Sequence, residues 1–477
     1  MPIKPLSLPI ESNPGRFGQD GDPRLVNVFA EKRGDKDQAG KGMVAHYAVP
    51  GLTAWATIAN GGATRGLFAV DNSQLLAVSG QAVVSLDPFG NGTFLGGMMG
   101  TGHVSFARNL KSPEPQIVLV SSSQTKVVKG LTLSDITDPD LPPANSCDFL
   151  NRYVLFGHST GRFSYSDINE ATSISSLSYY VAEGKPDGLK RLKVFGNQVW
   201  LFGEETTEIW VLTDSVDNPF RRLDGPYLDV GCLATHAVTQ VGQRLAWVAN
   251  DFTVRLASGY DAAIISTHAV SSAIEALADP REIEASVMTI RGHQMLRLNS
   301  SEWTWVCNLT PGYGMWHEEQ SIGMSRRRAA HYARFAGKHI TGDAEAAKLW
   351  EVDADVGVDG DTPLICRLVT APQHVYPGEV EFNALYLDGI AGAGLNTPDA
   401  AQTLDPVFMV RDSDDGGATW SSELTLPVGR LGATKTRAVA HQLGTSSEDG
   451  RQFEISWDAA ANKAITGAAV DAVAVAP

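Results

Sequence analysis

A strand–turn–strand pattern recurs between about residues 64 and 353, and this repeat constrains the fold more than any other feature of the chain. Successive units start about 37 to 49 residues apart, which is the range of four-stranded propeller blades. A twisted sheet of this size buries its faces only against its neighbours, so the array closes into a ring or extends as a solenoid. Closure is commoner for such blades, and it predicts a β-propeller of about seven blades. The first strands are predicted near Leu67, Val104, Phe149, Leu192, Val238, Val287 and His331.

The clearest hairpin of the repeat lies in residues 199–210. Residues 199–202 form an unbroken apolar run, and residues 206–210 supply β-branched and aromatic side chains after a turn at 203–205. Continuous apolar runs with this composition are typical of strands that are buried on both faces. The segment therefore predicts a sheet unit that packs between neighbours.

The segments on either side of the repeat predict two further β elements. Residues 1–62 alternate proline and glycine with short strands, so we expect an extended N-terminal arm that packs on later parts of the chain or on a neighbouring subunit. Residues 354–362 form a polar, glycine-rich boundary. We therefore predict an arm over 1–62, a propeller over 63–355 and a C-terminal β-sandwich-like domain over 356–477. Its strand-like segments are 364–369, 380–387, 406–410, 424–427, 437–443, 453–457 and the tail from Ala459.

The composition agrees with an all-β fold and limits the possible partners. The apolar fraction of 43% is enough for full-sized cores, while 47 glycines and 24 prolines favour many turns. The only helical pattern is short, at residues 271–278. The net charge of −16 disfavours a DNA-binding surface, which depends on clustered basic residues. An acidic surface lets DNA slide past without sticking, or simply aids solubility.

The cysteines and the N-terminus carry no signal for a metal site or a membrane. The four cysteines lie far apart, without a CxxC pair or a histidine at zinc-ligand spacing. We expect them to be reduced core residues, and we expect no metal or cofactor. The proline-rich start does not resemble a signal peptide, and no apolar run approaches the roughly 18 residues of a membrane span. The sequence thus predicts assembly in a cytoplasm and no membrane insertion.

An Asp-box, S-x-D-x-G-x-x-W, is complete at Ser413, Asp415, Gly417 and Trp420. The carboxylate of Asp415 can accept backbone N–H groups across the turn, and Gly417 permits a positive φ. Trp420 can pack beneath the hairpin. The box is familiar from sialidase propellers, where it lies on outer turns away from the chemistry. It therefore predicts a structural hairpin and not a catalytic site.

A second motif, GxSxG at residues 157–161, matches the nucleophile elbow of α/β-hydrolases. The motif follows a strand, as an elbow does, but an elbow must then enter a helix. Residues 162–167 alternate like a second strand instead. We interpret the motif as a hairpin turn.

Three charged clusters are candidates for binding or catalytic sites. Four aspartates between residues 353 and 361 suggest a calcium loop, but Leu364 stands where the bidentate glutamate belongs, so an acidic linker turn is favoured. Residues 326–328 are three arginines, which we expect to contact a carboxylate on another subunit or to form a solvated turn, and less so to bind phosphate. His317–Glu319 lacks the second histidine of a metalloprotease helix. No catalytic constellation is present, so we do not expect an enzyme.

Many short segments in one order resemble those of a known family. They begin with RLVNVFAE at 24–31 and include AEGKPD at 182–187 followed by the WLFGEETTEIW hairpin at 200–210. The others are 49–52, 65–67, 219–220, 231–232, 265–270, 304–306, 315–318, 337–343, 413–420, 429–432 and 453–456. Together they resemble the tail-hub, or packaged-DNA stabilisation, proteins of short-tailed bacteriophages (podoviruses).

The resemblance implies a structural protein of the virion tail. Such hubs, or nozzles, form a sixfold ring below the portal and the head-to-tail adaptor ring, retain the packaged DNA and form the channel for its ejection. The implied partners are other copies of the chain, the adaptor ring, the tail needle or plug, and tailspikes or fibres, with double-stranded DNA passing transiently. Assembly would take place in the cytoplasm of the bacterial host.

The Asp-box leaves a second interpretation open, a carbohydrate-active or glycan-binding β-propeller of the sialidase or lectin type. A sialidase would need an arginine cluster, a Tyr/Glu pair and usually several boxes, whereas one box is present.

Overall fold

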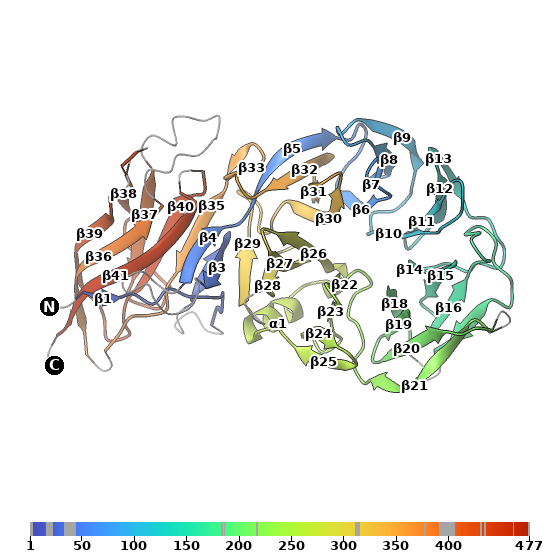
Figure 1. Cartoon of the computed structure of the whole chain (residues 1–477). Coiled ribbons are helices and arrows are strands. Elements are labelled where there is room, and N and C mark those ends of the chain that lie inside the picture. Colours follow the sequence, from blue (N-terminus) through green and yellow to red (C-terminus); the bar gives the residue numbers. More distant parts are fainter. Residues whose placement is uncertain are drawn as a thin grey trace.

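Seven four-stranded antiparallel units surround one axis in the computed structural model (Figure 1). The structure describes residues 3–15, 22–32, 44–182, 185, 187–215, 218–310, 315–375, 378–390, 406–429, 432–433, 436–460 and 462–475. Within these residues the chain is nearly all β, as predicted, and forms a β-propeller beside a β-sandwich.

The blades follow one another along the chain. Blades 1 and 2 contain β6 (Thr64–Ala69), β7 (Leu75–Ser79), β8 (Ala82–Leu86) and β9 (Gly92–Gly97), then β10 (Ser105–Arg108), β11 (Gln116–Val120), β12 (Thr125–Lys129) and β13 (Thr132–Asp135). Blades 3 and 4 contain β14 (Ser146–Leu150), β15 (Tyr153–His158), β16 (Arg162–Tyr165) and β17 (Tyr179–Val181), then β18 (Leu189–Phe195), β19 (Gln198–Gly203), β20 (Thr207–Leu212) and β21 (Phe220–Leu228).

Blades 5 to 7 complete the ring. Blades 5 and 6 contain β22 (Val238–Val241), β23 (Arg244–Val248), β24 (Val254–Ser258) and β25 (Asp261–Ile264), then β26 (Glu284–Ile290), β27 (His293–Asn299), β28 (Thr304–Asn308) and β29 (Met315–Glu319). Blade 7 contains β30 (Ala329–Phe335), β31 (Lys338–Asp343), β32 (Lys348–Asp353) and β5 (Gly51–Thr57), with a small hairpin of β33 (Val358–Asp359) and β34 (Thr362–Pro363) attached.

The predicted first strands are the inner strands of the blades. Six of the seven predicted positions lie inside the first strand of a blade, and Val104 immediately precedes β10. The hairpin predicted at residues 199–210 is the β19–β20 pair, with Val199 opposite Trp210. Both faces of this hairpin are buried because hydrophobic clusters lie on either side of it. The spacing of apolar runs therefore located the blades correctly.

The ring is closed by a strand from the beginning of the chain. β5 pairs antiparallel with β32, so residues far apart in sequence share blade 7. On the inner side β30 packs against β6 of blade 1, and a Cβ on Gly342 of β31 would collide there with Thr64. This close approach explains a glycine inside the strand. The closed ring thus packs the sheet of the last blade against that of the first.

The sandwich consists of two sheets that enclose one hydrophobic core, which includes Phe29, Leu385, Phe453 and Trp457. Sheet one contains β1 (Lys4–Pro5), β3 (Val28–Lys32), β4 (Val44–Ala48), β41 (Ala464–Ala474), β36 (Val380–Gly389) and β39 (Ala438–Thr445). Sheet two contains β2 (Arg24–Val26), β35 (Ile365–Val369), β40 (Gln452–Asp458), β37 (Val407–Ser413) and β38 (Leu424–Pro427).

The segment predicted as an N-terminal arm is divided between the two domains. Strands β1 to β4 complete the sandwich sheets, and β5 belongs to the propeller. In space the sandwich therefore combines the start of the chain with residues after 364, while the propeller begins at Gly51. Short strands rich in proline and glycine lack a core of their own, and these strands obtain one from the C-terminal segment.

One α-helix, α1 (His268–Glu275), occurs among the described residues, close to the pattern at 271–278. Thr267 caps its N-terminus by accepting a hydrogen bond from the Val270 amide, and Val270 and Ile274 are buried. Among the described residues, no helix has the length and apolar character needed to span a membrane.

Candidate functional site

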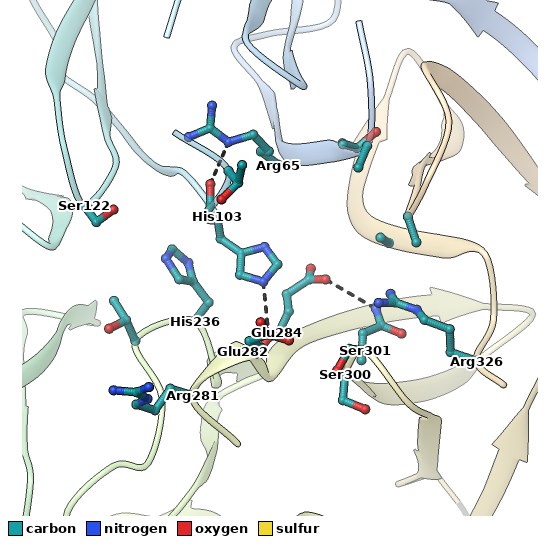
Figure 2. A pocket seen from close by; sticks show the side chains of 18 of the residues that line it. Arg65, His103, Ser122, His236, Arg281, Glu282, Glu284, Ser300, Ser301 and Arg326 are labelled. Carbon is teal, nitrogen blue, oxygen red and sulfur yellow. Dashed lines mark hydrogen bonds between the residues drawn. The ribbon is translucent and has the colours of Figure 1, made fainter. Parts of the chain in front are cut away.

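The propeller axis contains two cavities that meet at a narrow waist, where the same polar side chains line both. The first has a volume of about 450 Å³, and Figure 2 shows side chains from several blades around it. The second, of about 320 Å³, lies on the other side of the waist. His236 and Glu284 line both cavities, while His103 lines the first and His331 the second. The axis therefore brings three histidines and a glutamate together at the boundary of the two cavities.

Three histidines and a carboxylate close the waist. Nδ1 of His103 lies 3.1 Å from Nε2 of His331, and Nδ1 of His331 lies 3.1 Å from Oε1 of Glu284. The ring of His236 packs 5.1 Å from that of His103, measured between centroids. Burial, followed by the nearby charge of His331, lowers the pKa of His103 to about 4, and burial followed by His103 holds the pKa of His236 well below its usual range.

Arg65 lies beside the first cavity but is committed to the fold. Its guanidinium is buried and donates to the carbonyl oxygens of Gly102 at 2.7 Å, Gly80 at 3.0 Å, Met98 at 2.8 Å and Met99 at 3.2 Å. Four carbonyl acceptors use most of its donors. Arg65 therefore fixes the β7–β8 turn and the loop between blades 1 and 2, and it is not free to bind an anion.

The arginine cluster at 326–328 is not a solvated turn, and it does not need another subunit for a partner. Arg327 is 1% exposed and lies 3.2 Å from Asp359 and 3.6 Å from Glu319, while its Nη2 donates to the Pro50 carbonyl at 3.0 Å. Arg328 lies 3.3 Å from Asp343. The expectation for these two residues was wrong because their partners come from other strands of the same chain.

Glu319 is the centre of this buried network. Burial raises its pKa, but Arg297 at 2.8 Å, the hydrogen bond with His317 and the charge of Arg327 outweigh burial and bring the pKa to about 2. The carboxylate therefore stays ionised. Through Arg327, which also donates to the Pro50 carbonyl, it connects blade 6 with the residues just before β5.

The aspartates between residues 353 and 361 point to different partners. Asp359 is fully buried against Arg327, Asp355 pairs with Arg291, and Asp361 lies 3.4 Å from Lys348. Within the part of the chain that the structure describes, no group of three or more histidine, cysteine or acidic side chains is arranged to hold a metal ion. This segment is an ion-paired hairpin on the edge of blade 7.

The Asp-box residues lie in the loop between β37 and β38 of the sandwich, outside the propeller. Ser413 donates to Asp415 at 2.7 Å and accepts from the Gly417 amide at 2.9 Å. Asp415 also accepts from the Thr419 amide at 2.8 Å, and the Thr419 hydrogen bonds lower its pKa to about 2. Gly417 has a φ of 96°, and the Trp420 ring faces the Arg411 guanidinium at 5.1 Å. These contacts stabilise a turn and leave no reactive group free.

The GxSxG segment forms the turn between β15 and β16, so the hairpin interpretation is confirmed. Ser159 is exposed in this turn. The preceding His158 is buried and bonds the Pro143 carbonyl and Ser164, not Ser159. The segment therefore has neither the helix nor the base that an elbow requires.

The four cysteines are buried, as expected of core residues. Burial raises the pKa of Cys147 and Cys366 and brings that of Cys232 to about 12. Thiols in such surroundings are poor nucleophiles.

The RLVNVFAE segment joins the propeller to the sandwich. Arg24 forms a two-pronged ion pair with Glu318 of blade 6. The Asn27 side chain donates to the carbonyls of Gln320 and Ile365, both at 2.8 Å, and accepts from the Gln320 amide at 2.9 Å. β2 itself pairs with β29 on one side and β35 on the other, so one sheet runs from blade 6 into the sandwich.

A second contact at the end of this segment strengthens the joint. Glu31 lies 3.1 Å from Nε2 of His293, whose ring also packs edge-on against Phe29. Of the AEGKPD segment, Glu183, Gly184 and Pro186 lie outside the described residues, as do Arg430 and Leu431. Asp187 is described, and it accepts the Glu205 and Thr206 amides at 2.9 and 3.0 Å, fixing the turn of the β19–β20 hairpin.

Several solved structures resemble this chain, and one of them is described as a β-propeller domain. The WD40 β-propeller domain of Doa1 matches with a TM-score of 0.42 and 14% identity over 63% of this chain and 96% of that chain. Virginiamycin B lyase from Staphylococcus aureus matches with a TM-score of 0.43 and 12% identity, over 61% of this chain and 94% of the lyase chain. PorZ from Porphyromonas gingivalis matches with a TM-score of 0.39 and 12% identity, over 80% of this chain and 46% of the PorZ chain. Similarity at this level carries no argument about what the chain does.

Comparison with sequences is more specific. No curated protein matches the chain. A family model, Phage_stabilise, described as "Bacteriophage P22 Gp10, beta-propeller", matches residues 23–357, which is more than half of the chain. The match begins at the joint segment and ends at the boundary after blade 7, so it covers the whole closed ring. The chain therefore belongs to this family of bacteriophage structural proteins, named after the β-propeller of P22 Gp10.

Proposed function

We propose that the protein is a tail hub, or nozzle, that assembles as a sixfold ring below the portal and adaptor, retains packaged DNA and forms its ejection channel. The observation that carries this proposal is the family match over residues 23–357. The family is structural, which supports a role without catalysis. The same role implies contacts with the adaptor ring, the tail needle or plug, and the tailspikes or fibres, in a tail assembled in the host cytoplasm.

In this proposal the DNA passes between subunits and not through a propeller. The axis of one propeller is closed by side chains from different blades that approach within 3.1 Å of one another. No duplex can enter such a waist. A channel must therefore be formed by several copies around a shared axis, which requires two different contact surfaces on each subunit.

The charge and stiffness of the chain support the same role. The net charge of −16 repels a passing polyanion, so DNA would move through an acidic ring without binding to it. In the closed propeller the sheets of the first and last blades pack against each other, and one continuous sheet joins the propeller to the sandwich. A part that retains DNA under pressure needs this resistance to deformation.

Native mass spectrometry of the full chain, with and without the adaptor ring, tests the proposal. We expect a monomer or weak oligomer alone and six copies on each adaptor ring. An unrelated β-propeller mixed with the same ring is the control and should not bind. A single unassociated copy in both samples would contradict the proposal.

The Asp-box gives little support to the carbohydrate interpretation. It lies in the sandwich between β37 and β38, away from the axial cavities. Turnover of a fluorogenic glycoside, or binding on a glycan array by the isolated chain, would favour that alternative instead.

A further inference from the structure

A chain of hydrogen bonds crosses the propeller axis at the waist between the two cavities. It runs from the Glu284 carboxylate to Nδ1 of His331 at 3.1 Å, and from Nε2 of His331 to Nδ1 of His103 at 3.1 Å. It ends where Nε2 of His103 lies 3.2 Å from the carbonyl oxygen of Glu282, a contact drawn in Figure 2. Both ends of the chain are acceptors. The chain joins the loop before blade 2 to blades 6 and 7.

The number of protons in this chain follows from its geometry. Three contacts need three hydrogens, and neither the carboxylate nor the carbonyl supplies one. Two neutral imidazoles carry only two hydrogens on their four ring nitrogens. One contact would then place two lone pairs face to face. A third proton satisfies all three contacts and gives the pair of rings one positive charge, which the Glu284 carboxylate balances.

The groups around the two rings keep the charge of the His103–His331 pair at +1. Glu284 is buried, and it also accepts from the Asn299 side chain at 3.3 Å and from the His331 amide at 3.1 Å. Burial raises its pKa, but His331 outweighs burial and keeps it well below the usual range, so the carboxylate stays ionised. Burial and His331 lower the pKa of His103 to about 4, so a second charge enters the pair only in acid.

Several other titratable or charged groups face the rings from neighbouring elements, and each opposes further protonation or balances it. Arg326 lowers the pKa of His103 and so acts against a second positive charge there, while His103 and then Arg191 lower the pKa of His236, the ring that packs against His103. The remaining charged side chains that line the two cavities are Arg65, Arg281, Glu282 and Lys193.

The backbone at His331 is shaped to present this ring. His331 has a φ of 56°, in the left-handed region that few residues other than glycine adopt, although histidine, like asparagine and aspartate, adopts it more often than most. The pairing of β30 with β31 shifts register between Ala330 and Tyr332, so His331 sits in a bulge. Its carbonyl accepts from the Thr341 hydroxyl at 2.6 Å. Bulges re-aim side chains, and maintained strain of this kind points to a function.

We propose that His103, His331 and Glu284 form a proton-dependent latch that closes the propeller axis. With one shared proton all three hydrogen bonds are made, and the latch holds the loop before blade 2 against blades 6 and 7. Loss of that proton in alkaline solution leaves one contact without a hydrogen. A second proton in acid brings two positive rings together. In either case the latch releases and the two cavities join.

The proposal predicts how stability depends on pH. In the unfolded chain two ordinary histidines, with a pKa of about 6.5, together carry two protons well below that pH and none well above it. The latch carries one. Unfolding therefore takes up a proton in acid and releases one in alkali, so the contribution of the pair to stability is greatest near pH 6.5 and falls on both sides.

Urea unfolding of the full chain between about pH 4.5 and 8.5 tests this prediction, with the wild type compared with the double variant His103→Gln, His331→Gln. Glutamine retains a donor and an acceptor but does not titrate. We expect the ratio of the two unfolding constants to change by about threefold over the first pH unit on each side of pH 6.5, and by nearly tenfold over the next. His268→Gln, at an exposed histidine on α1, is the control and should follow the wild type. A ratio that is flat, or that changes in one direction only, overturns the latch.

Hydrogen exchange of the wild type provides a second test that needs no variant to fold. After correction for intrinsic rates, peptides covering residues 99–105, 280–286 and 329–333 should be best protected near pH 6.5. Their exchange should rise at least tenfold toward pH 4.5 and pH 8.5, while sandwich peptides at 365–369 and 452–458 stay constant. Equal changes in both sets, or no change at the axis, would also overturn the proposal.

Discussion

The joint between the two domains and the axis of the propeller both connect segments far apart in sequence, but they use different bonds. At the joint, backbone pairing continues from β29 through β2 to β35. At the axis, blades meet through imidazole rings and a carboxylate. Backbone amides do not titrate near neutral pH, whereas histidine does. The joint therefore rests mainly on backbone pairing, with one histidine, His293, beside Glu31, whereas the proposed latch at the axis consists of titratable side chains.

The largest expected effect concerns the buried ion network beside the joint. Arg327→Ala leaves the Glu319 and Asp359 carboxylates buried without this partner. Breaking a buried pair by removing one partner costs about 3–5 kcal/mol, so we expect a loss of that order in the free energy of unfolding. Urea denaturation measures it. Arg437→Ala, which removes a partly exposed pair with Asp388, is the control and should change stability little.

The joint itself can be weakened at Asn27. Asn27→Ala removes three hydrogen bonds and places alanine at a φ of 57°, so we expect a loss of about 3 kcal/mol. Asn27→Gly loses the same bonds but tolerates the positive φ, and it should be about 1 kcal/mol less costly. Equal denaturation midpoints for the two variants would mean that backbone conformation plays no part here.

The Glu284→Gln variant tests whether the carboxylate stabilises the shared proton at the axis. The amide keeps an acceptor for His331 but removes the negative charge that stabilises the shared proton. We expect the alkaline limb of the stability profile to move about one pH unit toward acid, equivalent to about 1.4 kcal/mol. Unfolding measured across the alkaline range tests this shift. A limb that does not move would show that the carboxylate does not hold the proton.

The smallest effect is expected at the Asp-box, which belongs to neither connection. Asp415→Ala removes the acceptor for Thr419 and opens the turn between β37 and β38. Because the contacts are local, the global midpoint should stay unchanged while limited proteolysis within residues 413–424 becomes faster. Asp449→Ala, in an exposed loop of the same domain, is the control. A cooperative loss of the whole sandwich would contradict a local role.

Local patterns predicted the blades well because each blade contains its own turns. Apolar runs separated by glycine or asparagine turns define a hairpin without reference to the rest of the chain. The strands of the sandwich were located for the same reason, with β35 and β40 within about one residue of the predicted limits. Pairing between distant strands has no such local signal, so the division of residues 1–62 between the two domains was not predicted.

The axial cluster was missed because its members are isolated in the sequence. His103 and His236 each lie shortly before a strand and His331 lies inside β30, and only closure of the ring brings the three into contact. The expectation for Arg327 was wrong for a related reason. Three consecutive arginines suggest an exposed turn, while the carboxylates that bury Arg327 lie on other strands. The three histidines lie at or near the predicted first strands of three blades. Because first strands line the axis of a propeller, a closed ring would have placed these histidines close to one axis.

The strand that completes blade 7 can pair only late in synthesis, so blade 7 cannot be completed until most of the chain has been made. β5 leaves the ribosome early but has no partner until β32, about three hundred residues later, has been synthesised. β2 to β4 wait still longer for β35 and β41. During translation this first segment carries unpaired strand edges, and the nascent chain depends on timely completion of its far end to protect them.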